Sequence, residues 1–154
     1  MRKFCLICCI VILSIACDKQ RVFEQFITID NQSWSNTNKL YFNVNINDTV
    51  SAYNLYVITR NTGQYEYSNL YLFITAHSPD GNQVRDTTEI SLANENGKWL
   101  GKGSSAFTLK YPYRKNIKFP LRGIYQFDIE QAMWVEDLKH ISHVGLRIEK
   151  IDIK

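Results

Sequence analysis

Cysteine is missing from all but the first seventeen residues of this chain. The four cysteines are Cys5, Cys8, Cys9 and Cys17, and none follows Cys17. A domain folded from the rest of the chain therefore has no disulfide and no cysteine-based metal site. The stretch that starts at Cys17 has 138 residues, which is 154 less the first 16. That is the usual length of one domain, large enough to bury a core without covalent links.

An excess of either charge is also lacking. Lys and Arg number 18 and Asp and Glu 15, so that without Arg2 and Lys3 the remaining 16 cations leave a net charge of +1. Strong non-specific attraction to nucleic acid requires a basic surface that this balance does not indicate. We therefore expect no nucleic acid partner.

Sequence motifs for catalysis and for cofactors are absent as well. The chain has no glycine-rich phosphate loop with its lysine and no serine at nucleophile-elbow spacing. The sequence predicts a protein that is not an enzyme and that carries no cofactor.

The N-terminus has the features of a lipoprotein signal. Met1-Arg2-Lys3 is followed by an uncharged run from Phe4 to Ala16 and then by Cys17. The run is too short to cross a bilayer stably, and it follows a basic segment as the apolar region of a signal peptide does. Ser14 stands where such signals more often have leucine. We predict cleavage before Cys17 and acylation of Cys17, with palmitate among the chains. An ordinary secretory signal or a short membrane anchor is the alternative.

This interpretation divides the chain into three parts. Residues 1–16 are predicted to be the signal peptide, and residues 17–25 the lipidated cysteine and a polar tether without a period. Residues 26–154 are predicted to form the folded domain. The lipid places that domain in the cell envelope, anchored to a membrane and facing the periplasm.

Alternation of apolar and polar residues predicts a chain of β-strands. It is clearest at residues 40–46, where Leu40, Phe42, Val44 and Ile46 alternate with polar residues and Tyr41. Further strands are predicted at 53–60, 69–76, 84–92, 123–130 and 144–151, separated by turn sequences at 61–63, 78–81 and 94–97. Strands that recur every 10 to 15 residues without an amphipathic helix between them favour an all-β fold. The predicted fold is one antiparallel β-sandwich of the jelly-roll type.

Three segments are harder to interpret. Gly101 and Gly103 indicate a bulge or a close backbone approach. A strand is expected at 106–109, which Tyr111-Pro112-Tyr113 would break. A short helical turn is expected at 136–139.

Few residues are candidates for site chemistry. His140 and His143, with Glu136, could bind a metal ion if they lay on one helical turn, but loop histidines explain them equally, and no metal site is predicted. Asp128 and Glu130 share one side of a strand, as glycosidase carboxylates can, although charged residues are expected on a solvated strand face. Asp80-Gly81-Asn82 is similar to part of an oxygen-rich calcium loop but lacks the further carboxylates of such a loop, so a plain turn is favoured.

Aromatic residues are the more informative group. A sugar ring could stack on exposed aromatic side chains, although most large aromatics of an all-β domain are part of its core. The candidates for such a surface are Trp34, Trp99, Trp134, Tyr65, Tyr67 and Tyr71.

An ordered series of local sequences resembles the GldH family of gliding-motility lipoproteins. The series spans nearly the whole chain after Cys17. It comprises Phe23-Glu24, Trp34, the segments 53–56, 60–61 and 65–73, Pro79-Asp80-Gly81, Asp86-Thr87, and the segments 97–103, 123–125, 130–133 and 138–149.

The resemblance implies a cell-envelope lipoprotein associated with gliding motility and with type IX secretion. It implies no catalytic site. We therefore expect a non-enzymatic assembly or interaction factor whose partners are the membrane and other envelope proteins. The alternative is a module that binds carbohydrate or peptidoglycan.

Loops carry binding residues more often than strands do. The predicted interaction residues are accordingly Tyr65, Tyr67, Asn69 and Trp99, which lie in two loops. Trp99 between its glycines is favoured as a core residue, with an exposed contact residue as the alternative.

Overall fold

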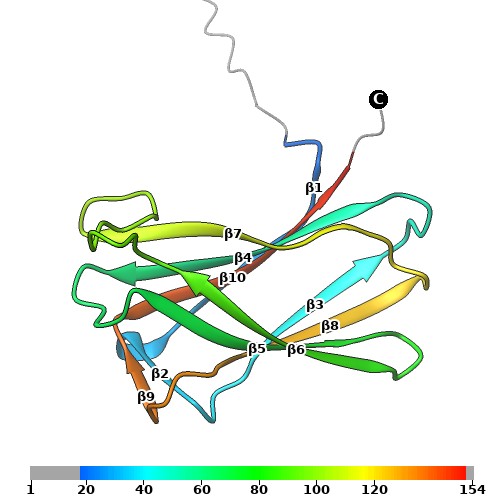
Figure 1. Ribbon diagram of the computed structural model, residues 1–154. Coiled ribbons are helices and arrows are strands. Elements are labelled where there is room, and N and C mark those ends of the chain that lie inside the picture. Colours follow the sequence, from blue (N-terminus) through cyan, green and yellow to red (C-terminus); the bar gives the residue numbers. More distant parts are fainter. Residues whose placement is uncertain (1–17, 152–154) are drawn as a thin grey trace, which may run out of the picture.

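Two four-stranded antiparallel sheets face each other in the computed structural model, which describes residues 18–151 (Figure 1). The first sheet has the order β1 (Arg21–Thr28), β10 (Ile141–Lys150), β4 (Tyr53–Thr62) and β7 (Ala106–Ile117). The second has the order β3 (Leu40–Ile46), β8 (Gly123–Gln131), β5 (Asn69–His77) and β6 (Gln83–Ser91). A 3₁₀ turn, η1 (Asp30–Gln32), and a two-stranded ribbon of β2 (Ser33–Ser35) and β9 (Asp137–Lys139) complete the fold.

The eight long strands have the connectivity of a jelly roll. Successive strands mostly cross between the sheets, and each sheet pairs strands that are distant in sequence, as β1 with β10 and β3 with β8. This arrangement confirms the predicted single-domain antiparallel sandwich.

Side-chain alternation explains the strands that line the core. In β3 every second residue is buried and Tyr41 points outward, as period-two sequences require. The strand predicted at residues 69–76 is confirmed by β5, whose Leu70, Leu72 and Ile74 are buried in the same alternating way. Between the two sheets these side chains form one hydrophobic core.

Trp34 closes one end of this core. Its side chain has no exposed surface, and its Nε1 donates a hydrogen bond of 2.8 Å to the carbonyl of Asn38. A buried indole usually has such a partner, so Trp34 is a structural residue.

The predicted tether was wrong for residues 21–25. They belong to β1, which pairs along its length with β10, Phe23 opposite Ile148 and Glu24 opposite Arg147. β1 is an edge strand, and the exposed faces of an edge strand do not require an apolar pattern. Its partner lies at the other end of the sequence, beyond the reach of a local pattern.

Pro112 does not break the seventh strand, contrary to the prediction. β7 continues from Ala106 to Ile117, and Pro112 lies opposite Tyr56 beside two register shifts. Proline is tolerated because β7 is an edge strand, where an N–H that faces away from the sheet needs no partner.

The helical turn predicted at 136–139 was also wrong. Residues 137–139 form β9, in which Leu138 is buried opposite Trp34. Contact with β2, a hundred residues away, outweighs the local preference of such a short segment.

The predicted turns are confirmed at 78–81 and 94–97. Gly81 and Gly97 adopt φ values of 86° and 75°, where only glycine is unstrained. A close backbone approach is confirmed at Gly103, where a Cβ would lie 1.8 Å from the carbonyl oxygen of Ala106. The predicted signal peptide and Cys17 lie outside the described residues. Within 18–151, no helix has the length and apolar character needed to cross a bilayer.

Candidate functional site

The four predicted interaction residues lie together at one end of the sandwich but differ in exposure. Tyr65 is buried, and its hydroxyl donates a hydrogen bond of 2.9 Å to the carbonyl of Asn69. Burial raises the pKa of Tyr65 far above its usual range. The half-exposed ring of Tyr67 packs edge-on against the ring of Tyr65, with 5.6 Å between the ring centroids. The Asn69 amide donates to Glu89 at 2.7 Å. Tyr65 thus supports Tyr67 from the core side.

Trp99 covers the edge of the core and is half-buried. Its ring stacks on the ring of Phe107, with 5.7 Å between the centroids. It also packs in a tilted orientation against the ring of Tyr65, with 6.3 Å between the centroids. A Cβ on the nearby Gly101 would lie 3.0 Å from the backbone of Phe107. Glycine therefore lets the segment of Trp99 lie close against β7.

Trp134 was a candidate for the aromatic surface but was not among the four predicted interaction residues. Its relative exposure is 102%, whereas its neighbours Met133 and Val135 pack against the core. The side chain of Gln131 holds this loop. It accepts a hydrogen bond of 2.8 Å from the N–H of Met133 and donates one of 2.9 Å to the carbonyl of Val135. The indole is therefore presented by an ordered loop. The in-out-in pattern of Met133-Trp134-Val135 was the sequence feature that could have identified it.

The aromatic residues do not form one platform among the residues described. Trp34 and Tyr65 are buried, and Trp99 is half-buried at the edge of the core. Tyr67 and Val135 line one small cavity of about 70 Å³, beside the loop that carries Trp134. Of the other candidates, Tyr67 is half-exposed, and Tyr71 and Trp134 are exposed.

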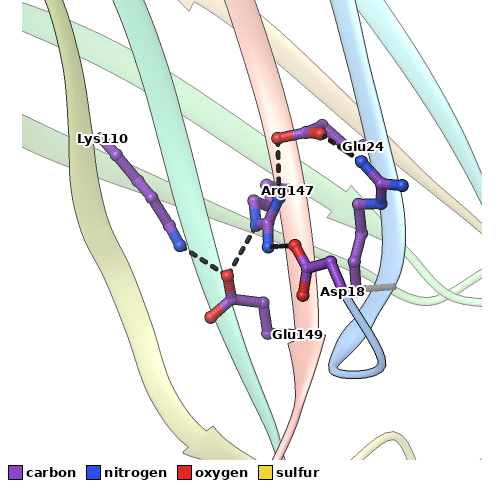
Figure 2. Close-up of polar contacts among 6 residues, drawn as sticks. Asp18, Glu24, Lys110, Arg147 and Glu149 are labelled. Carbon is purple, nitrogen blue, oxygen red and sulfur yellow. Dashed lines mark hydrogen bonds and ion pairs between the residues drawn. The ribbon is translucent and has the colours of Figure 1, made fainter. Parts of the chain in front are cut away.

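A second site is the ion-pair network that ties the start of the chain to β10 (Figure 2). Arg147 donates through Nε to Glu149 at 2.6 Å and through Nη1 to Glu24 at 3.0 Å, and its Nη2 contacts Asp18. Lys110 on β7 also binds the Glu149 carboxylate. The network spans three strands and the residue that follows Cys17.

The charges in this network stabilise one another. Burial by itself lowers the pKa of Arg147, but hydrogen bonds with the three carboxylates raise that pKa above its usual value. The hydrogen bond from Arg147 lowers the pKa of Asp18. Burial raises the pKa of Glu149, and hydrogen bonds from Lys110 and Arg147 more than offset this and lower it. Asp18, Arg147 and Glu149 are therefore ionised at neutral pH.

Asp128 and Glu130 are held by separate side chains on the outer face of the second sheet. Asp128 contacts His77 at 2.9 Å. Glu130 contacts Arg85 at 3.1 Å and Lys39 at 3.3 Å. These contacts account for both carboxylates within the sheet, because His77 lies on the neighbouring β5, Arg85 on β6 beyond it, and Lys39 just before β3.

The histidine pair does not share a helical turn. His140 links β9 to β10 with a φ of 68°, and His143 lies within β10 with Nδ1 3.0 Å from the hydroxyl of Ser142. The carboxylate of Asp80 bonds to Ser78 and Asn82 within its own turn. In the described part of the chain, no three His, Cys, Asp or Glu residues are grouped as metal ligands.

Comparison with known proteins identifies the family. Residues 21–148 match the family model described as GldH lipoprotein. The chain belongs to the GldH lipoprotein family. This confirms the resemblance predicted from the sequence, and the matched GldH region contains Arg147, Trp134 and the four predicted interaction residues.

Two GldH relatives match over nearly their full length. The gliding motility lipoprotein GldH homolog of Christiangramia forsetii is 35% identical over 150 residues, which are 92% of this chain and 91% of the relative. The gliding motility lipoprotein GldH of Flavobacterium johnsoniae is 33% identical over 149 residues, 92% of each chain.

A solved structure of infectious bursal disease virus is 16% identical, with a TM-score of 0.34. The match covers 83% of this GldH-family chain and 32% of the viral chain, so this chain spans about a third of it. A likeness at that level supports no inference about the function of this chain.

Proposed function

We propose that the protein is a non-enzymatic interaction factor of the cell envelope, anchored by acylated Cys17 and facing the periplasm. It works with the gliding-motility and type IX secretion machinery. Membership of the GldH lipoprotein family supports the lipid anchor, and the names of the two relatives support the motility context.

The exposed indole of Trp134 is the observation that carries the interaction function. Tryptophan is enriched among the residues that dominate binding energy at protein interfaces. Gln131 restrains the loop before binding, which lowers the entropy lost on association.

The indole projects at the end of the sandwich away from the anchor. β8 begins at Gly123 opposite Ile46, and the loop with Trp134 follows its other end after Gln131. The predicted interaction residues Tyr67, Asn69 and Trp99, with Tyr65 beneath Tyr67, lie at this same end. We name Tyr67, Trp134 and Val135 the distal surface.

The lipid anchor is tested by Cys17→Ala. We expect the variant to leave the membrane fraction and to take up no labelled palmitate, whereas the wild type stays with the membrane and takes up the label. Deletion of the gene is expected to impair gliding, or type IX export in a host that does not glide. A variant that still pellets with membranes, beside a wild type without label, would contradict the lipoprotein assignment.

The distal surface is tested by crosslinking and affinity capture from the native envelope. We expect Trp134→Ala to lose the crosslinked partner without any change in the melting temperature. Ile124→Ala is the matched control, because Ile124 is also a highly exposed apolar residue and lies near the other end of β8. Equal capture by the wild type and by Trp134→Ala would refute the role of this surface.

Glycan binding is the second candidate that Trp134 supports, because a sugar ring can stack on an exposed indole. A glycan or peptidoglycan array with residues 18–154 distinguishes the two candidates. Binding that depends on Trp134 would replace the protein partner with a glycan.

A further inference from the structure

The folded domain begins one residue after the proposed lipid anchor. Asp18 directly follows Cys17 in the sequence. Its carboxylate contacts Arg147, and its carbonyl accepts a hydrogen bond of 3.2 Å from the N–H of Arg21. One residue spans at most about 3.6 Å. Acyl chains on Cys17 therefore hold the end of the sandwich that carries Asp18 at the membrane surface, without a flexible spacer.

Several segments distant in sequence meet at this anchored end. The N–H of Lys150 donates to the carbonyl of Gln20 at 2.7 Å, so the end of β10 lies beside the start of β1 (Figure 1). The ammonium of Lys150 reaches Asp48 at 2.6 Å in the loop after β3. The end of β7 and the start of β8 lie there too, because Tyr53 pairs with Ile117 and Ile46 with Gly123.

Cations without partners gather at this end. In residues 18–151, Lys19, Lys115, Lys118 and Arg122 are exposed and have no ion pair or hydrogen bond through their side chains. Of the carboxylates there, Asp18 is paired with Arg147 and Asp48 with Lys150. Asp80 bonds only to uncharged partners within its turn. The net charge from Cys17 onward is only +1, so this concentration of positive charge does not reflect a basic chain.

The opposite end of the sandwich has a different balance of charged side chains. Carboxylates that are exposed and unpaired within the described range accompany the distal surface, mixed with Lys98, Lys102 and Lys139. They are Asp30, Glu66, Glu95, Glu136 and Asp137. Charge therefore distinguishes the two ends.

Two exposed apolar side chains lie among the cations. Val50, in the loop after β3, has a relative exposure of 78%, and Leu121, next to Arg122, has one of 37%. Apolar residues flanked by Lys and Arg are typical of surfaces that lie in the headgroup layer of a membrane. Each such cation near an anionic leaflet contributes about 1 kcal/mol to binding.

We propose that this end of the sandwich docks onto the bilayer that holds Cys17, with its cations bound to the phosphates of anionic phospholipids. We name Lys19, Val50, Lys115, Lys118, Leu121 and Arg122 the anchor-end surface. The contact orients the domain so that Trp134 points away from the membrane. This inference rests on the lipid anchor of the proposed function.

The test uses the acylated protein reconstituted in vesicles. Cys17 is consumed by the lipid, so an introduced cysteine is the single free thiol and carries a polarity-sensitive fluorophore. Val50→Cys reports on the anchor-end surface, and Glu95→Cys reports on the opposite end. The vesicles contain phosphatidylcholine and phosphatidylglycerol. We expect the emission of the label at position 50 to shift to the blue and to be quenched by a quencher bound to the lipid headgroups. The label at position 95 is expected to stay exposed to water.

The cations are tested by Lys115→Gln, Lys118→Gln and Arg122→Gln combined. We expect the label at position 50 to become water-exposed while the protein stays in the vesicles. Removing Lys98, Lys102 and Lys139 in the same way is the matched control and is expected to change nothing. For residues 18–154, which contain the whole core, flotation with the same vesicles should weaken roughly fivefold for each of the three cations removed at the anchor end.

The outcomes separate the two proposals. Protein that lacks acyl chains by mass spectrometry and stays out of the vesicles overturns the lipid anchor. Acylated protein whose labels at positions 50 and 95 are equally exposed, or whose label at position 50 ignores the charge of the lipid, overturns the docking.

Discussion

The hydroxyl of Tyr113 on β7 donates a hydrogen bond of 2.7 Å to the carboxylate of Asp86 on β6. Arg114 pairs with the same carboxylate. β6 and β7 are edge strands of different sheets, so no backbone ladder joins them. Tyr113 and Arg114 therefore join the two sheets through their side chains, where the strands themselves do not pair.

Removing the hydroxyl tests this link. Because a hydrogen bond to a charged group contributes more than a neutral one, Tyr113→Phe should lower the free energy of unfolding by about 1 to 2 kcal/mol. Urea unfolding of residues 18–154 measures the change. Tyr41→Phe, with an exposed ring on β3, is the control and should be neutral. Equal stability of the two variants would show that the link does not stabilise the fold.

The same carboxylate predicts a pH dependence. Hydrogen bonds from Tyr113 and Arg114, against the effect of burial, lower the pKa of Asp86 below its ordinary 3.8. The stabilisation is therefore complete above the unfolded value and is lost as the pH falls through the lower folded value. The wild type should have a larger free energy of unfolding than Asp86→Asn at neutral pH. Unfolding curves of the two proteins should converge as the pH falls below 3.8. Curves that keep a constant separation would exclude this contribution.

Trp99→Ala should destabilise the domain to a moderate extent. Full truncation of a buried tryptophan costs about 3 to 5 kcal/mol, and half-burial reduces this to about 2 kcal/mol. A thermal melt of residues 18–154 should show a fall of roughly 5 to 10 °C. Trp134→Ala, with its exposed indole, is the control and should melt like the wild type. No shift for Trp99→Ala would assign Trp99 to contact alone.

Thr59→Val should leave the stability unchanged or raise it by up to about 1 kcal/mol. Thr59 has no exposed surface, and among the described residues its hydroxyl oxygen finds no hydrogen-bond partner. Valine keeps the shape and removes the unpaired polar group. Chemical denaturation measures the difference, and Val57→Ala, which leaves a cavity in the same strand, should lose several kcal/mol. A loss of stability in Thr59→Val would reveal a partner for the hydroxyl.

The candidate site was only partly accessible from the sequence. The composition of the loops identified Tyr65, Tyr67 and Trp99 as a group, and the structure places them together. Their exposures differ because the sandwich covers Tyr65 and leaves Tyr67 half-open. The exposure of Trp134 depends on Gln131 and on the packing of Met133 and Val135, which no local pattern specifies.

The sequence by itself determined the family and the all-β class. It also determined the strands whose inner faces are apolar, such as Leu40–Ile46, because burial of every second side chain leaves a pattern along the chain. Only the tertiary structure decided the strands Arg21–Thr28 and Asp137–Lys139, the continuation of β7 through Pro112 and the contact of Asp18 with Arg147. Each of these depends on a partner strand distant in sequence or on a position at a sheet edge, where backbone pairing leaves no hydrophobic signature.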